Sequence, residues 1–241
     1  FAPLDLGLDL DHVDKDIMME HGTAVPADPD GDRTVPYADC GILLPGFGLR
    51  IVDDEGAEVP ERQCGQILLK GPSVMSGYFQ DPESSSAVLD EDGWLNTGDI
   101  GYRVGDRLFL TARSKDVIII KGRNIWPNDM EVVAQRIEGA RLGGVAAFSV
   151  AGLDEEETAV LVLESKERDE TVRAELTQQI SELMHEHFGI NVVIDLVKTG
   201  SLPRTSSGKL SRYKSKLAFL ERHHHRDVHF LTRKGSERKI A

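Results

Sequence analysis

The sequence has few cysteines, a shortage of basic residues and no long hydrophobic run, and each shortage excludes a class of protein. The two cysteines, Cys40 and Cys64, are too few and too unpatterned for a disulfide framework or a metal site. We therefore expect buried, reduced thiols and a cytoplasmic protein. The strongly apolar runs, such as those at 117–120 and 159–163, are far shorter than the ~20 residues that cross a bilayer, so we expect no transmembrane segment.

Acidic residues outnumber basic ones by 41 to 28, which gives a formal net charge of −13 and a pI of about 5.0. This balance argues against a nucleic-acid backbone or an anionic membrane as the main partner. It leaves room for a small anionic substrate, which needs only a local basic site. The 241 residues suffice for one large domain or two small ones. No secretory signal is visible, and Phe1 is not a start methionine, so we expect the chain to begin inside a longer polypeptide.

The first half of the chain reads as a surface loop followed by β structure. Residues 1–38 contain a cluster of turn-forming residues at 26–33, and we expect one short helix there, near 15–21. Strands are expected at 48–52, 65–70 and 106–111, separated by turns such as the one at 53–56. Short strands at this spacing predict a small antiparallel sheet or barrel.

The second half reads as a compact α+β unit. A strand at 117–121 precedes Pro127, after which apolar residues at 130, 133, 134 and 137 predict a helix that Gly139 can end. Strands at 144–150, 158–163 and 192–197 and helices over 172–188 and 212–222 complete the pattern. We place the boundary between the halves near 113–116. The three histidines that open the tail at 223–241 indicate a solvated helix end or a tag rather than a metal site.

Three polar turns are candidates for chemistry, and each has a plain alternative. The carboxylate of Asp99, in Thr97-Gly-Asp99, could accept hydrogen bonds from the two hydroxyls of a ribose, or it could bond its own backbone in an Asx-turn. The segment Arg113-Ser-Lys-Asp116 could be a hinge in which Arg113 contacts a ligand, or a β-hairpin turn. Gly122 could allow the backbone to approach a ligand closely, or mark a bulge or a strand end.

The fourth candidate is the loop Ser201-Leu-Pro-Arg-Thr-Ser-Ser-Gly-Lys209, which presents one lysine among small polar residues. Lys209 could meet an anion there, although a solvated turn is the ordinary alternative. The loop is not a nucleotide-hydrolase phosphate loop, because Pro203 stands where that motif requires glycine and Leu210 where it requires serine or threonine. Lys209 is therefore a single cation rather than part of a backbone cradle.

Taken in order, four segments resemble the closing motifs of the adenylate-forming enzymes, the superfamily of acyl-CoA synthetases, fatty acyl-AMP ligases, luciferases and peptide-synthetase adenylation domains. The segments lie at 65–79, 93–99, 113–124 and 202–209, and the resemblance extends from about 40 to 215. Two further stretches resemble the fatty acyl-AMP ligases most: Asn124-Ile-Trp-Pro-Asn-Asp-Met-Glu131, and residues 9–45, which are similar to the extra segment of those ligases.

The resemblance implies an α+β fold of two parts. Residues 1–112 would form a small β-rich, barrel-like subdomain that closes a large N-terminal domain, with the ligase-specific insertion in about 9–45. Residues 113–117 would form a hinge, residues 118–222 a mobile C-terminal α+β domain, and residues 223–241 a tail. The rest of the N-terminal domain, with its phosphate loop and fatty-acid tunnel, would lie upstream of Phe1.

The resemblance also implies a function. Such enzymes activate a fatty acid with ATP to an acyl-adenylate (acyl-AMP) and pyrophosphate, and fatty acyl-AMP ligases then pass the acyl group to an acyl carrier protein or a polyketide synthase carrier domain. Asp99 and Arg113 match the residues that hold the ribose of ATP or AMP, Lys115 the hinge position, and Lys209 the catalytic lysine.

Mg²⁺ is expected in the full-length enzyme, with its glutamate ligand outside this chain, so we assign no metal ligand here and expect the chain alone to be inactive. Two alternatives stay open, a long-chain fatty acyl-CoA synthetase and a non-catalytic module that docks a carrier protein.

Overall fold

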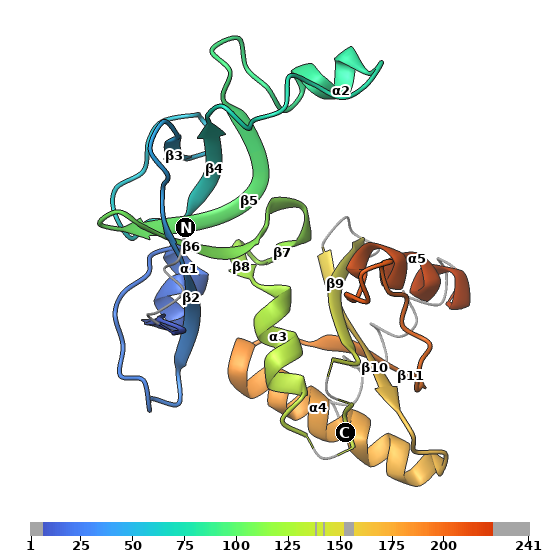
Figure 1. The fold of residues 1–241 in the computed structure, drawn as a ribbon. Helices are drawn as coiled ribbons and strands as arrows, with labels where there is room; N and C mark the ends of the chain where they lie inside the picture. The colour runs from blue at the N-terminus through green and yellow to red at the C-terminus, as the bar shows by residue number, and fades with distance from the viewer. Residues whose placement is uncertain (1–6, 138, 142, 152–156, 224–241) are drawn as a thin grey trace. The chain divides into compact units, whose positions relative to one another are not determined.

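The computed structural model describes residues 7–137, 139–141, 143–151 and 157–223, so the predicted tail lies outside the described residues apart from His223. The chain divides into two compact units, the first ending at Lys115 and the second beginning at Asp116. Figure 1 draws the elements of both units, and each unit is described by itself below.

Unit 1 is built on a six-stranded antiparallel sheet with the strand order β1-β2-β6-β5-β4-β3. The predicted antiparallel sheet is thereby confirmed, as are the predicted short helix, α1 (Lys15–His21), and the strands at 48–52 and 65–70. A second short helix is α2 (Pro82–Ser86). The strands are β1 (Leu10–Asp14), β2 (Thr34–Ile42), β3 (Gly48–Val52), β4 (Gly65–Lys70), β5 (Leu95–Val104) and β6 (Arg107–Arg113).

Two expectations for unit 1 need correction. The sheet is open rather than barrel-like, because β1 and β3 are its opposite edges and no pairing joins them in the part of the chain that the structure describes. Residues 1–38 are also less irregular than expected, since β1 and most of β2 lie there and pair along five residues from Leu10↔Ala38 to Asp14↔Thr34. Pro36 lies opposite His12 in the pairing of β1 with β2, and the pairing of β2 with β6 begins only at Asp39, so proline is tolerated at a point where β2 is paired on one side.

The core of unit 1 centres on Tyr102, which is fully buried. Its ring stacks on Phe109 with centroids 5.1 Å apart and meets Tyr37 edge-on. Its hydroxyl donates to Asp11 Oδ2 over 2.8 Å, and Arg62 pairs with the same carboxylate. Burial raises the pKa of Tyr102, and the contact with Asp11 raises it further, so the group stays a neutral phenol. This hydrogen bond ties edge strand β1 to central strand β5.

The cysteines lie in different surroundings. Cys64 is half-buried beside Met18, and burial raises the pKa of its thiol to about 12, so it is no thiolate at neutral pH. Cys40 is exposed, which corrects the expectation that both thiols are buried, and the two are not joined in a disulfide.

Unit 2 contains a three-stranded sheet of order β11-β10-β9 and a separate hairpin. Strand β10 pairs antiparallel with β9 and parallel with β11, and helix α4 provides the crossover that a parallel pair requires. The elements are β7 (Ile118–Ile120), β8 (Arg123–Ile125), α3 (Pro127–Ala134), β9 (Val145–Ala151), β10 (Glu157–Ser165), α4 (Glu170–Phe188), β11 (Val192–Lys198) and α5 (Arg212–Arg222).

Both faces of this sheet are covered by helices, because successive side chains of a strand point to opposite faces. One face packs under α5, where Phe148, Val162 and Phe219 belong to a single buried cluster. On the other set of alternate residues lie Ala147 and Leu161, and α3 and α4 contribute Met130, Val133, Leu176, Ile180 and Met184 to the core. Figure 1 shows α4 and α5 on opposite sides of β9–β11.

The ends of the unit 2 helices follow from local chemistry. The carboxylate of Asp169 accepts the N–H groups of Thr171 and Val172 at the start of α4, and Gly189 ends the helix in the left-handed conformation that favours glycine. Helix α5 begins and ends where predicted. Helix α3 ends at Ala134, before the predicted position 137, because the chain leaves the helix in a short turn at Gln135.

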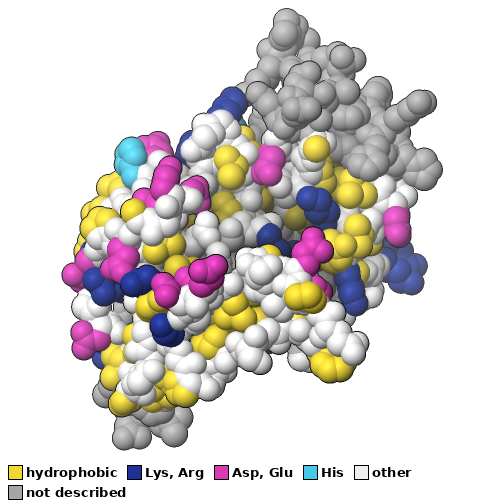
Figure 2. All heavy atoms as spheres, turned by 90° about the horizontal axis from the view of Figure 1, so that it is seen from above, with side chains coloured by type: hydrophobic (Ala, Val, Ile, Leu, Met, Phe, Trp, Pro, Cys, Tyr) yellow, Lys and Arg dark blue, Asp and Glu magenta, His cyan; other side chains and the backbone are white. Residues whose placement is uncertain are grey.

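The surface carries mixed charge. On the face drawn in Figure 2, acidic and basic side chains are interspersed with hydrophobic ones. Among the described helices, none is long and apolar enough to cross a membrane.

Phe219→Ala tests the core of unit 2. The side chain is fully buried and its ring lies 5.7 Å from that of Phe148, so its removal should lower the free energy of unfolding by about 3–5 kcal/mol. Urea denaturation followed by circular dichroism measures the loss. Tyr213→Ala, on the same helix but 69% exposed, is the control, and its effect should stay within about 0.5 kcal/mol. Equal effects of the two substitutions would contradict this account of the core.

Candidate functional site

Asp99 and Arg113 form an ion pair across two neighbouring strands. They lie directly opposite each other in the β5–β6 pairing, and Arg113 Nε contacts Asp99 Oδ1 at 2.9 Å. The bonds that stabilise the turn come from other side chains, since Asn96 accepts the N–H of Gly98 and Thr97 that of Asp99. The Asx-turn alternative for Asp99 is therefore wrong, because its carboxylate contacts Arg113 instead.

The geometry of this pair suits a polar ligand. The Asp99 side chain is 27% exposed and that of Arg113 56%, so both can be reached from solvent. The guanidinium fixes the orientation of the carboxylate, and a carboxylate held in this way is a strong acceptor for hydroxyl groups. The pair thus suits a ligand that presents hydroxyl groups, and the contact of Asp99 and Arg113 with the ribose of ATP or AMP stays a prediction.

The other two turns have defined structures. Lys115 is exposed in a 3₁₀ turn, Ser114–Asp116. The flanking strands β6 and β7 belong to different sheets, so the β-hairpin alternative for 113–116 is wrong, while the role of Lys115 as a hinge stays a prediction. The turn at Lys121 and Gly122, whose φ angles are +53° and +75°, joins β7 to β8, which agrees with the strand-end alternative for Gly122.

Lys209 lies at the end of a tight, internally bonded turn. We call residues 203–211 the lysine loop. The N–H of Thr205 donates to the carbonyl of Lys209 over 2.7 Å, and that of Gly208 to the carbonyl of Thr205 over 2.9 Å. Arg204 and Leu210 form a β-bridge at the base, and Lys209 itself is exposed. The loop is thus a small hairpin that fixes the backbone of the lysine and leaves its side chain in solvent.

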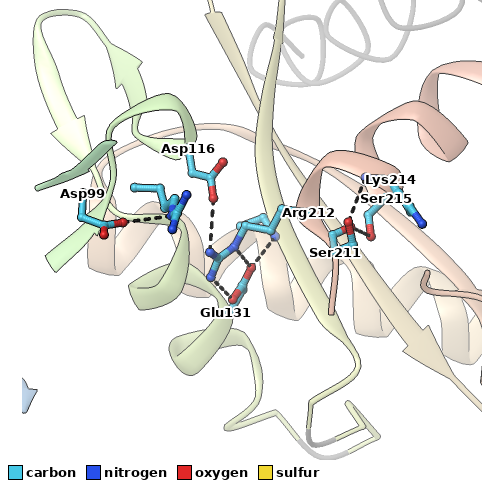
Figure 3. Close-up of polar contacts among 9 residues, drawn as sticks. Asp99, Asp116, Glu131, Ser211, Arg212, Lys214 and Ser215 are labelled. Atoms are coloured by element: carbon cyan, nitrogen blue, oxygen red, sulfur yellow. Dashed lines mark hydrogen bonds and ion pairs between the residues drawn. The ribbon is translucent and has the colours of Figure 1, made fainter. Parts of the chain in front are cut away.

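The exit of the lysine loop is held by an ion-pair network that the sequence reading missed. Arg212 donates from Nε and Nη2 to the two carboxylate oxygens of Glu131, each over 2.7 Å, and lies 3.6 Å from Asp116. Glu131 Oε1 also accepts the backbone N–H of Ala147 on β9. Figure 3 shows Glu131 and Asp116 on two sides of the Arg212 guanidinium.

This network has a clear electrostatic effect. The hydrogen bond to Glu131 raises the pKa of Arg212, which therefore remains a cation despite its partial burial. The one signal available in the sequence was the glutamate that interrupts the apolar run of α3. The contact spans 81 positions, so its partner could not be read from the local sequence.

Within the described part of the chain, no group of three or more His, Cys, Asp or Glu side chains is arranged to hold a metal ion. The expectation that the Mg²⁺ ligand lies outside this chain is not tested by that finding.

Comparison with known proteins supports the motif resemblance. Residues 18–79 match the family model of the AMP-binding enzymes. A Caulobacter vibrioides protein named "Putative acyl-CoA synthetase" is 43% identical over 91% of this chain. A solved structure from work on fatty acyl-adenylate ligases of E. coli and L. pneumophila covers 89% of the chain with a TM-score of 0.78 and 36% identity. The chain belongs to the adenylate-forming, AMP-binding superfamily.

Another relative of this superfamily member is the long-chain-fatty-acid–AMP ligase FadD32 of Mycolicibacterium smegmatis, 32% identical over 87% of the chain. The chain spans only part of these relatives: 38% of the Caulobacter protein, 39% of FadD32 and 38% of the solved structure.

Arg212→Lys tests the network at the exit of the lysine loop. Lysine keeps the charge but cannot bind the Glu131 carboxylate with two parallel hydrogen bonds, so the free energy of unfolding should fall by about 1–3 kcal/mol. Urea denaturation measures the change.

The matched control is Arg222→Lys on the same helix. Arg222 meets Asp195 through one nitrogen and is more exposed, so this change should cost less than about 1 kcal/mol. A larger loss for Arg222→Lys than for Arg212→Lys would show that the paired geometry at Glu131 has no special weight.

Proposed function

We propose that this chain is the C-terminal portion of a fatty acyl-AMP ligase. In this proposal the full-length enzyme joins a fatty acid to ATP, giving an acyl-adenylate and pyrophosphate, and then passes the acyl group to an acyl carrier protein or a carrier domain. The observation that carries the proposal is the Asp99–Arg113 pair, held in register on β5 and β6, in a chain that also mounts Lys209 on a braced loop. Likeness to FadD32 and to the fatty acyl-adenylate ligase structure supports the acyl-AMP class.

Asp99, Arg113 and Lys209 each have a role in the first half-reaction. Asp99 accepts the ribose hydroxyls, and Arg113 orients that carboxylate and lies within reach of the same sugar. When bound, ATP supplies the α-phosphorus that the fatty-acid carboxylate oxygen attacks, with pyrophosphate as the leaving group. Lys209 donates hydrogen bonds to the oxygens on which negative charge gathers during this in-line displacement. A cation placed in this way contributes more to the transition state than to the bound substrates.

The second half-reaction requires a different arrangement. The thiol of the carrier's phosphopantetheine arm attacks the acyl carbonyl and AMP leaves, so a cation poised for adenylation has no further task there. We propose that residues 113–117, with Lys115 among them, act as the hinge about which Lys209 is withdrawn after adenylation. The Mg²⁺ required for the first step would be held by a glutamate outside this chain.

A long-chain fatty acyl-CoA synthetase is the second candidate, because the Caulobacter relative carries an acyl-CoA synthetase name. The two candidates differ in the acceptor of the acyl group. The full-length enzyme, ATP and dodecanoate should be incubated with either CoA or a phosphopantetheinylated acyl carrier protein. Transfer to the carrier protein supports the proposal, whereas transfer to CoA alone identifies the second candidate. Failure to form any acyl-adenylate would indicate a non-catalytic module that docks a carrier protein.

Lys209→Ala is the sharpest test of the catalytic assignment. Loss of the cation should lower the rate of dodecanoyl-AMP formation by the full-length enzyme about 10²–10³-fold. Transfer from chemically made dodecanoyl-AMP to the acceptor should remain within about two-fold of wild type, because Lys209 acts only in the first half-reaction. ATP–pyrophosphate exchange and acyl-transfer assays measure the two steps.

Lys214→Ala provides the control, since Lys214 is an exposed lysine five positions away on α5. It should leave both half-reactions unchanged. Near-normal adenylation by the Lys209→Ala enzyme would overturn the role given to Lys209.

A further inference from the structure

The lysine loop can direct Lys209 only if its own base is fixed. The internal bonds of the loop set the shape of the hairpin but not its direction. That direction depends on the two chain ends, which meet where the N–H of Ser211 donates to the carbonyl of Pro203 over 2.9 Å. Arg212 and Glu131 hold the outgoing end, as described above. The group that holds the incoming end is therefore equally important.

The incoming end is bound by a carboxylate from the middle of the sheet. The N–H of Leu202 donates to Glu164 Oε1 over 2.9 Å, across 38 positions of sequence. The side chain of Leu202 is buried in the same cluster as Phe219, so both its backbone and its side chain are anchored. Leu202 directly precedes the lysine loop.

Glu164 is an unusual residue for its position. It lies near the end of β10, the central strand, and its side chain is fully buried. Its second oxygen, Oε2, receives Arg141 Nη1 at 2.7 Å. Burial alone would raise the pKa of Glu164, but the N–H groups of Leu202 and Gly200 and the Arg141 guanidinium hold it below its ordinary value. Both oxygens are thus occupied by protein groups.

The same short segment that supplies Arg141 also holds the loop directly. Arg204 donates from Nη2 to the carbonyl of Gly143 over 2.7 Å and from Nη1 to the carbonyl of Gly208 over 3.1 Å. The carbonyl of Gly144 accepts the N–H of Glu164, and a Cβ at position 144 would lie 3.1 Å from Glu164 Oε2. Arg141 and Gly144 therefore lie close to Glu164, and Gly143 between them in sequence contacts the lysine loop.

Burying a carboxylate carries a desolvation penalty, which hydrogen-bond and ion-pair partners must offset. An apolar residue of similar size at the end of β10 would pack without that desolvation cost. The neighbouring positions Val162 and Leu163 on the same strand are indeed apolar and buried. The carboxylate at 164 differs from them in what it joins, because it connects the sheet, Arg141 and the base of the lysine loop.

We infer that Glu164 is a positioning residue for Lys209, which acts by fixing the incoming end of the lysine loop. This inference rests on the proposed adenylation function of Lys209. Glu164 touches no substrate in this account. Its effect on the rate comes from the placement of the lysine, and a misplacement of about 1 Å at a reacting centre costs about 10²-fold in rate.

The test uses Glu164→Gln in the full-length enzyme. An amide of the same shape has only one oxygen, so its NH₂ group must face either the N–H of Leu202 or the guanidinium of Arg141, and one contact is lost. Dodecanoyl-AMP formation should fall about 10–100-fold in kcat with little change in the KM for ATP. Transfer from added dodecanoyl-AMP should stay within about two-fold of wild type.

A double-mutant cycle shows whether Glu164 acts through Lys209. In the Lys209→Ala enzyme, Glu164→Gln should reduce adenylation further by less than about two-fold, because the group that it positions is already gone. Glu157→Gln is the matched control: this glutamate lies at the other end of β10 and also accepts a backbone N–H, that of Ile119, but has no link to the lysine loop. It should leave adenylation unchanged.

The outcomes separate the inference from the function on which it rests. If Lys209→Ala adenylates normally, the proposed function fails. If Lys209→Ala is defective while Glu164→Gln is active, or if the two losses multiply, only the positioning role is overturned.

Should circular dichroism show that Glu164→Gln does not fold, Arg141→Gln is the deciding variant. The Arg141 side chain is about half exposed, and its replacement removes only the partner of Glu164 Oε2. It should slow adenylation about 3–10-fold and not acyl transfer, and a folded, fully active Arg141→Gln enzyme would overturn the role of Glu164.

Discussion

The arrangement around the lysine loop depends on the ion pair between Glu131 and Arg212. Glu131 stands on α3, bonds the backbone of β9 and receives Arg212 from the first turn of α5, so one carboxylate joins three elements. Two charges that are largely withdrawn from water would destabilise the fold if either lost its partner. Here the two hydrogen bonds and the contact with Ala147 satisfy the carboxylate, and α5 is consequently fixed in both position and rotation. The lysine loop ends at Ser211, the N-cap of α5, so the position of the helix also fixes that end of the loop.

Most elements could be predicted because their causes are local. Helix α4 shows its apolar stripe, a capping aspartate and a terminal glycine within 21 residues of sequence, and α5 follows its own pattern equally well. The strands β1 and β2 were missed because their stability comes from pairing with each other across a segment rich in turn-forming residues. The barrel-like form failed for a related reason, since closure depends on contacts between the edge strands that no local pattern encodes. Helix α3 was overextended because its apolar spacing continues beyond the residue where the backbone turns.

The residues of the candidate site also fall into two groups, those that local sequence identified and those that only the fold revealed. Asp99 and Arg113 were each singled out, and their ion pair follows from a hairpin register that puts them opposite one another. Lys209 was found because its loop is compositionally distinct. Glu131, Arg212, Glu164 and Arg204 were not found, since the contacts Leu202–Glu164, Arg204–Gly143 and Arg212–Glu131 span 38, 61 and 81 positions. A glutamate at the end of the apolar run Ala159–Leu163 was the visible signal for Glu164, but its partners could be known only from the fold.

If Lys209 acts as we propose, these buried ion pairs and hydrogen bonds give a flexible side chain a defined starting position. Lysine has a long stem with about 2 kcal/mol of rotamer entropy, and a loose backbone would spread its cation over a wider volume still. The hairpin, the Arg204 contacts and the two carboxylates fix the backbone of the loop, so only the side-chain torsions of Lys209 remain free. Apolar packing could stabilise the same fold, but a hydrogen-bonded carboxylate restricts direction as well as distance. We therefore assign most of the stability of this unit to the apolar layers on both faces of the sheet, and the direction of the lysine loop to the charged groups of the interior.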